Sequence, residues 1–173
     1  MKKGLLIIGI LAFSMSVMAQ GDFVNKYFDL LQDDDAYTKV SVSSKMFSLF
    51  TELEAGSEAE EEFLKAISKL KGLKIVGSEN APNSFDIYKK ALADLNKLKY
   101  EELMSVKDGD QNMKFSIKEK GGIIEELVML AGSEKNFVLL SLYGEIDLKN
   151  ISKIARTLKV DGLENLGKLS DSE

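Results

Sequence analysis

The sequence predicts an α+β fold in which helices pack on one face of a mostly antiparallel sheet that ends in a C-terminal strand meander. Two observations lead to this prediction. Apolar residues recur at helical spacing in most segments of the first hundred residues, and from Tyr100 onward their period changes from 3.6 to 2. Strands that follow one another directly, instead of alternating with helices, indicate α+β architecture and antiparallel pairing.

The chain begins with the three-part pattern of a secretory signal peptide. Two lysines precede an apolar run, and Val17 and Ala19 place small residues at the two positions that a signal peptidase reads. The apolar run through Ala19 is shorter than the ~20 residues that a membrane-spanning helix needs. An uncleaved N-terminal anchor is the alternative. We therefore expect residues 1–19 to be a signal peptide and the protein to be periplasmic or secreted.

Removal of residues 1–19 would leave residues 20–173 as a single α+β domain. The loss of two of the 23 basic side chains, with all 28 acidic ones retained, gives this domain a net charge of −7. An acidic domain is a poor match for nucleic acid or for anionic membrane surfaces. No cysteine is present to carry a lipid anchor. The mature protein is thus expected to have no transmembrane segment, no lipid and no nucleic-acid partner.

The first half of this domain is predicted to be mainly helical. A run of three aspartates ends the first helix in a solvated turn. Ser57 and Glu60 form a capping box at the start of a later helix, and Gly72 ends it. The expected helices cover residues 22–32, 58–71 and 84–99, a short helix with Met46, Phe47, Leu49, Phe50 and Leu53 on its inner face follows Ser43 or Ser44, and strands cover residues 37–42 and 73–77.

The second half is predicted to be a meander of four strands. Glycine-containing turn signals separate these strands, as in Asp108-Gly109-Asp110 and Gly121-Gly122. The third and fourth strands are apolar on both faces, as strands at the centre of a sheet are. The expected strands cover residues 101–107, 113–120, 123–131 and 136–145, followed by a helix over residues 147–157 and a short helical turn around Leu163, Leu166 and Leu169.

The composition excludes several classes of chemistry. The chain contains no His and no Cys, so a Ser-His-Asp hydrolase, a thiol nucleophile and the usual catalytic zinc sites are ruled out. Arg156 is the only arginine, so paired guanidinium clamps on phosphate cannot form within one chain. Carboxylate, Lys, Tyr and Ser chemistry remain. We predict that the protein is not an enzyme, and we assign no catalytic, cofactor-binding or metal-binding residue and no cofactor.

One acidic segment matches the spacing of a calcium loop. Asp108, Asp110, Asn112 and Glu119 occupy the first, third, fifth and twelfth positions of that pattern. The sixth position must be Gly to make the sharp bend, and here it is Met113. The residues that follow alternate as a strand does. A hairpin turn is therefore the favoured interpretation.

Other polar groups have structural explanations that we favour over catalysis. Ser68 and Lys71 have the spacing of a Ser-Lys dyad but stand in the last turn of an amphipathic helix. The three aspartates at residues 33–35 cannot all point at one cation, and the acidic run at residues 58–62 suits a helix N-terminus.

Glu125 and Glu126 interrupt an apolar strand, so one of them must point to each face of the sheet. A lysine partner on an adjacent strand, or a place at the sheet edge, is favoured over a catalytic carboxylate.

Three segments resemble a known family. Residues 42–47, 114–132 and 137–148 are similar to the domain of unknown function 4252 family of small exported proteins from Bacteroidetes, and the likeness extends over roughly residues 37–169. Some members of that family look like lipoproteins, and this sequence departs from them because it lacks the anchor cysteine. The resemblance implies a cell-envelope location, and it carries no activity or site residue over to this chain.

Three functional hypotheses follow from these observations. The first is a non-enzymatic periplasmic or cell-envelope interaction module that presents a sheet face or edge to an envelope protein. The second is a carrier or sensor of a small apolar ligand held between the sheet and the helices. The third is a hydrolase that uses carboxylates alone, with Glu125 and Glu126 as the best available pair. The carrier's candidate lining residues are Met113, Phe115, Ile117, Leu127 and Met129, with the Phe47/Phe50 pair as a further apolar stripe.

Overall fold

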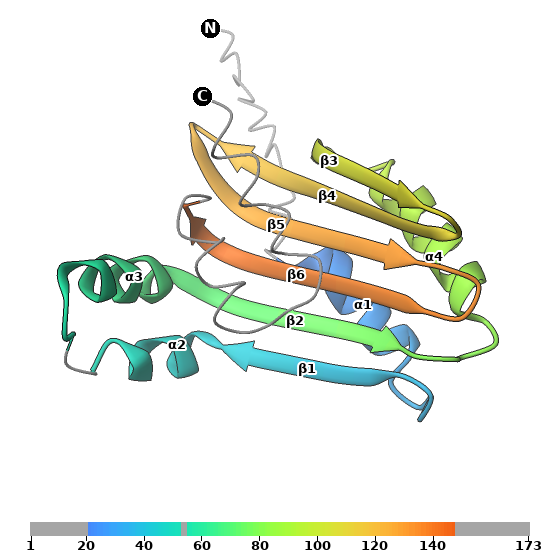
Figure 1. Cartoon of the computed structure of the whole chain (residues 1–173), viewed down its shortest axis with the longest axis horizontal. Coiled ribbons are helices and arrows are strands. Elements are labelled where there is room, and N and C mark those ends of the chain that lie inside the picture. Colours follow the sequence, from blue (N-terminus) through green and yellow to red (C-terminus); the bar gives the residue numbers. More distant parts are fainter. Residues whose placement is uncertain (1–20, 53–54, 148–173) are drawn as a thin grey trace, which may run out of the picture.

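The computed structural model describes residues 21–52 and 55–147 and consists of four helices and a six-stranded antiparallel sheet (Figure 1). The predicted α+β fold, with its C-terminal meander of β3 to β6, is confirmed. In chain order the elements are α1 (Asp22–Leu30), β1 (Thr38–Ser43), α2 (Ser44–Phe50), α3 (Glu58–Ser68), β2 (Leu70–Ser78), α4 (Ser84–Leu95), β3 (Glu101–Asp108), β4 (Gln111–Lys120), β5 (Ile123–Gly132) and β6 (Phe137–Ile146).

The strands lie in the order β1-β2-β6-β5-β4-β3, and every neighbouring pair is antiparallel. The last strand therefore lies beside β2 and joins the N-terminal pair of strands to the meander. The strands β5 and β6, expected to be central because they are apolar on both faces, are indeed central. Strands β1 and β3 form the two edges.

One face of the sheet, here called the helical face, packs against α1 and α4 (Figure 1). Aromatic rings fill much of the space between these layers. The Tyr27 ring lies 5.5 Å from that of Phe23 and 6.4 Å from that of Phe137, measured between centroids. The buried core on this side contains Phe23, Val24, Tyr27, Leu31, Tyr37, Val76, Tyr88, Ala91, Leu95, Val128, Leu130, Phe137 and Leu139.

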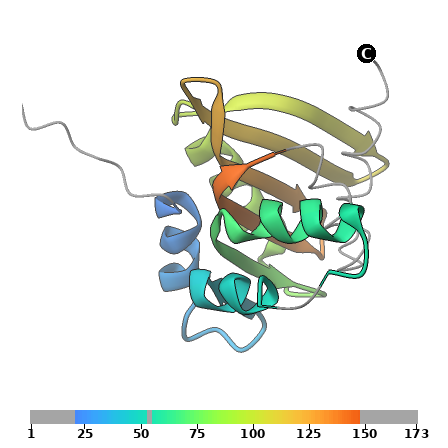
Figure 2. The same ribbon diagram turned by 90° about the vertical axis from the view of Figure 1, so that its left-hand side faces the viewer.

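The opposite face carries two continuous rows of apolar side chains and is here called the apolar face. Helices α2 and α3 lie at the end of the sheet where β1 finishes and β2 begins, and they add Phe47 and Ile67 to the buried cluster on this side (Figure 2). The strand register places in one row Val42, Leu73, Leu142, Leu127 and Ile117, and in the next Val40, Ile75, Leu140, Met129, Phe115 and Met104.

Helices α3 and α4 end three or four residues earlier than the sequence pattern predicts, and α1 ends at Leu30 instead of residue 32. Helix α3 ends at Ser68 instead of residue 71, because Leu70 already belongs to β2 and pairs with Gly144. Helix α4 ends at Leu95, and a turn of i→i+3 hydrogen bonds covers the residues up to Leu98. Sheet pairing thus shortens α3, and the tightened final turn shortens α4.

The expected signal peptide at residues 1–19 and all but the first residue of the expected helix at residues 147–157 lie outside the described residues, as does the expected turn around Leu163. Among the residues that the structure describes, no helix combines the length and apolar character needed to cross a bilayer.

Candidate functional site

The calcium-loop pattern is a hairpin, as the sequence analysis favoured. Strand β3 ends at Asp108 and β4 begins at Gln111, with Gly109 in the left-handed region at φ 59°. Glu119 is the second-last residue of β4, whereas Asp108 lies opposite Gln111, the first residue of that strand. Within residues 21–52 and 55–147, no three carboxylates gather in an arrangement that would hold a metal ion.

The other weighed groups also have structural roles. The Ser68 hydroxyl donates to the carbonyl oxygen of Lys65 at 2.7 Å. It stands at the end of α3, whereas Lys71 is an exposed residue of β2. The expected capping box is present: the Ser57 hydroxyl accepts from the Glu60 N–H at 3.3 Å, and the Glu60 carboxylate accepts from the Gly56 N–H at 2.6 Å.

Glu126 is the most deeply buried ionisable side chain of the sheet. It lies on β5, faces the helical side and is 1 % exposed, whereas Glu125 is only partly buried. Glu125 stands at a β-bulge between Ile124 and Glu126, which interrupts the strict alternation on which the expectation of opposite faces rests. Lys118 lies opposite Glu126 in the β4–β5 register, but no ion pair joins the two within the described part of the chain. The expected lysine partner is therefore replaced by other donors.

Three neutral donors satisfy the Glu126 carboxylate. The Ser141 hydroxyl donates to Oε1 at 2.6 Å, and the Tyr100 hydroxyl donates to Oε2 at 2.8 Å. The backbone N–H of Gly21, which caps the N-terminus of α1, donates to Oε2 at 3.4 Å. The positive end of the α1 dipole therefore faces the carboxylate. We call Glu126, Ser141, Tyr100 and Gly21 the Glu126 cluster.

Burial raises the pKa of Tyr100 above its ordinary value, and the adjacent charge of Glu126 and their hydrogen bond raise it further. The Tyr100 hydroxyl thus stays protonated and acts as a fixed donor. Tyr143 lies opposite Glu126 in the β5–β6 register and packs its ring on Gly21 and on Gly72, and at Gly72 a β-carbon would collide with it. The cluster fastens the start of α1, the chain before β3 and two central strands to one another.

A second polar cluster joins α1 to α4. Asp94 accepts hydrogen bonds from Lys26 Nζ at 2.5 Å and from the Tyr27 hydroxyl at 2.9 Å, and Lys97 lies 3.3 Å away. The hydrogen bonds from Lys26 and Tyr27 lower the pKa of Asp94 to about 2. Burial, the Asp94 hydrogen bond and its charge raise the pKa of Tyr27. Both clusters are arrangements that hold elements together.

The sequence analysis identified Glu126 but not its partners. Ser141 carried a signal, because it interrupts an apolar strand, and in the structure it is 0 % exposed. Tyr100 and Gly21 carried none, because their approach to Glu126 depends on how α1 and the chain before β3 fold over the sheet.

The apolar lining residues proposed for a carrier lie together. Phe115, Leu127 and Met129 share the apolar face and are 0–2 % exposed. Met113 and Ile117 belong to the same cluster. All five point away from α1 and α4, so the space between those helices and the sheet is lined by other residues. Phe47 is buried in this cluster as well, whereas Phe50 is 39 % exposed.

Exposed apolar side chains gather where β1 continues into α2. Val40 on β1 is 41 % exposed, and Met46, Leu49 and Phe50 on α2 are 46 %, 45 % and 39 % exposed. Helix α2 follows β1 without a break and packs against β1 and β2. These four residues, called the β1–α2 surface below, adjoin the hydrogen-bonding edge of β1, which has one neighbouring strand among the residues that the structure describes.

The two edges of the sheet differ in their protection against further pairing. Edge strand β3 carries a bulge and four exposed charged residues, which are Glu101, Glu102, Lys107 and Asp108. Edge strand β1 is regular, and Lys39 is its only charged residue. Lys39 Nζ donates to the carbonyl oxygens of Leu31 and Gln32, at 2.6 and 3.3 Å, so it does not project along the edge. Bulges and charges are the usual means by which edge strands avoid pairing, and β1 lacks both.

These features define an α+β protein in which residues 21–52 and 55–147 form a six-stranded antiparallel sheet with structural polar clusters and one unprotected sheet edge. The family described as Domain of unknown function (DUF4252) matches residues 27–154, about three quarters of the chain, and the chain belongs to this family. No curated protein and no solved structure matches the chain.

Proposed function

We propose that this protein is a non-enzymatic interaction module of the cell envelope, which binds a partner chain by adding an extended segment to the free edge of β1. The observation that carries the proposal is the contrast between the two edges. Strand β3 is guarded by a bulge and charges, whereas β1 is regular and borders the exposed apolar side chains of the β1–α2 surface. Strand addition uses main-chain hydrogen bonds for affinity and alternate side chains for specificity.

The partner segment is expected to be extended and apolar at alternate positions on the side of the apolar face. Val40 and Val42 point to that side of β1, and Met46, Leu49 and Phe50 extend the apolar area beyond the end of the strand. Location in the periplasm or outside the cell rests on the signal-peptide pattern of residues 1–19 and on the family resemblance.

The polar clusters support a non-enzymatic role. In the Glu126 cluster each carboxylate oxygen already accepts a hydrogen bond from the protein, and Glu125 stands at a bulge of the strand and makes no hydrogen bond to this cluster. A carboxylate that is 1 % exposed and already satisfied by protein donors is not available to flank a scissile bond together with Glu125. This arrangement disfavours the carboxylate-only hydrolase.

Carriage of a small apolar ligand is the second candidate. It is favoured by one observation, that the five proposed lining residues share the apolar face. Native mass spectrometry of protein purified without detergent tests it directly. A reproducible small-molecule adduct supports the carrier, and a bare chain in repeated preparations removes it.

The interaction proposal is tested with a photoreactive amino acid placed at Val40 in cells that make the full chain. The matched control carries it at Val106, which lies on the other edge strand and is 38 % exposed, close to the 41 % of Val40. We expect a discrete crosslinked protein band from position 40 and none of comparable strength from position 106. Equal or absent crosslinking at the two positions would remove the proposal.

A further inference from the structure

We propose that the segment added to β1 is the β1 strand of a second copy of this chain, so that two antiparallel β1 strands join two sheets about a two-fold axis. This inference rests on the proposed function of the β1 edge and names its partner. A two-fold interface needs a surface that is complementary to itself. Three properties of β1 and its flanks meet that requirement.

The first property is the side-chain pattern along the strand. Directly opposite residues of an antiparallel pair point to the same face of the sheet. Even-numbered residues of one copy must therefore oppose even-numbered residues of the other if Val40 and Val42 of both copies are to lie on one continuous apolar face. Pairing of Ser41 with Ser41 of the second copy meets this condition and sets Val40 opposite Val42. The two rows of apolar side chains then run from one sheet into the other.

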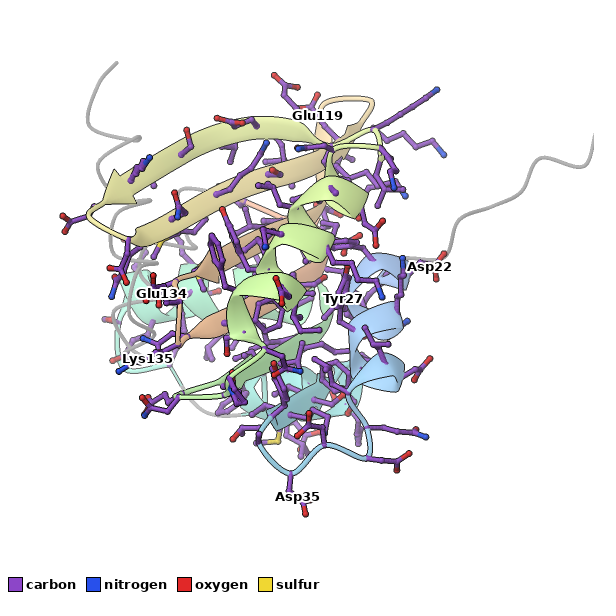
Figure 3. The ribbon with its side chains drawn as sticks, turned by 90° about the vertical axis from the view of Figure 1, so that its right-hand side faces the viewer. Asp22, Tyr27, Asp35, Glu119, Glu134 and Lys135 are labelled. Atoms are coloured by element: carbon purple, nitrogen blue, oxygen red, sulfur yellow. The ribbon has the colours of Figure 1, made fainter. Side chains whose placement is uncertain are left out.

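The second property is the placement of charge at the two ends of β1. The exposed Asp35 precedes the strand at the outer point of the α1–β1 turn (Figure 3). The exposed Lys45 follows the strand in α2. Neither side chain has an ion-pair partner in the described structure. Antiparallel pairing brings the Asp35 end of one strand alongside the Lys45 end of the other, and two-fold symmetry makes this contact twice.

The third property is that pairing of the two β1 strands sets no two charged side chains against each other. Lys39 would oppose Ser43 of the second copy, and its ammonium group is already bound to carbonyl oxygens of the α1–β1 turn. The two Lys39 side chains are thus kept from meeting. An unrelated partner would need to supply a strand with this same pattern, whereas a second copy supplies it by symmetry.

Cysteine crosslinking tests the proposal, because the chain contains no native cysteine. Ser41→Cys places a thiol on the proposed axis, where opposed Cα atoms are about 4.5–5.5 Å apart, within the range that a disulfide spans. Ser105→Cys is the matched control, an exposed serine on edge strand β3. Under mild oxidation of the full chain, we expect Ser41→Cys to form a disulfide-linked dimer at least about tenfold faster than Ser105→Cys. Equal rates would overturn the proposal.

Sedimentation velocity supplies a second, cysteine-free test. The unmodified protein should sediment as a dimer, and Val40→Lys should raise the dimer dissociation constant by roughly tenfold or more, because it sets like charges at the interface. Val106→Lys should leave the dimer intact.

A monomeric unmodified protein would overturn the second copy as the partner but not the addition of a strand from another protein. In that case a heterologous band in the Val40 photocrosslinking experiment keeps the proposed function, and the absence of any band removes both.

Discussion

At the scale of single residues, the fold depends on polar groups that are buried without an opposite charge. Glu126 is 1 % exposed and is satisfied by two hydroxyls and one backbone N–H. A buried carboxylate without a cation is tolerated only while its donors remain, because an unsatisfied charge carries a large desolvation cost. The donors are therefore worth more to stability than ordinary surface hydrogen bonds.

Removal of the Tyr100 hydroxyl should expose this dependence. We expect Tyr100→Phe to lower the free energy of unfolding by about 1.5–3 kcal/mol, the usual range for hydrogen bonds to charged groups. Tyr88→Phe is the matched control, since its ring is 7 % exposed and packs in the same core. The control should stay within about 0.5 kcal/mol of the unmodified protein. Urea denaturation of the three proteins measures the difference, and equal effects of the two substitutions would contradict the role of Glu126.

Asp94 should make stability depend on pH in acid. Its pKa is lowered in the folded protein to about 2 by hydrogen bonds from Lys26 and Tyr27. A carboxyl whose folded pKa is depressed contributes stability that is complete above its unfolded pKa of ~3.9 and is lost as pH falls toward the folded pKa. The contribution should be about 1 kcal/mol, because the Asp94 and Lys26 side chains are 19 % and 52 % exposed and water screens the pair.

The measurement is the melting temperature between pH 6 and pH 2 for the unmodified protein and for Asp94→Asn. The substitution should lower the melting temperature near neutral pH, and the two curves should converge as pH falls through the interval between ~4 and 2. Asp86→Asn is the control, because Asp86 forms only an exposed pair with Lys89, and its curve should run parallel to that of the unmodified protein. Curves for Asp94→Asn that remain parallel would contradict the depressed pKa.

At the scale of the elements, most of the structure could be predicted from the sequence. The capping box of α3, the glycine turns and the alternation along the meander are local signals, and each element that they predict among the described residues is present. The ends of α3 and α4 could not be predicted, because they are set by pairing of Leu70 with β6 and by the tightened turn after Leu95. Likewise, alternation along β5 could not predict the bulge at Glu125, and the partners of Glu126 come from distant segments.

Close packing of α4 on the sheet depends on one glycine. A β-carbon on Gly132 would lie 2.4 Å from Cγ and 2.6 Å from Cβ of Tyr88, which is the rigid base of that side chain. Gly132→Ala should therefore push α4 from the sheet and lower the free energy of unfolding by about 1–3 kcal/mol. A double-mutant cycle with Tyr88→Ala checks the cause. The cost of Gly132→Ala should largely disappear in that background, and an unchanged cost would place the strain elsewhere.

At the scale of the whole molecule, the strand order could not be predicted from the sequence. Adjacent strands of the meander are joined by short turns, so their pairing is local, but β6 also pairs with β2 across more than fifty residues of chain. This one non-local pairing joins the N-terminal strands to the meander. It also decides that β1 is an edge, and hence that the β1–α2 surface borders an unpaired strand.

The central place of β6 predicts that the molecule unfolds as one unit. Leu140 on β6 faces the apolar side and is 1 % exposed, whereas four of the five tyrosines pack in the core on the helical face. Leu140→Ala should lower the free energy of unfolding by about 2–5 kcal/mol through the cavity that it leaves. Because β6 is shared by both faces, the loss should appear equally in backbone and tyrosine signals.

Far-ultraviolet and near-ultraviolet circular dichroism measure these two signals separately, and the absence of Trp leaves the near-ultraviolet band to Tyr and Phe. Coincident transitions that shift together confirm a single cooperative unit. A tyrosine transition that stays in place while the backbone signal shifts would mean that the two faces unfold independently.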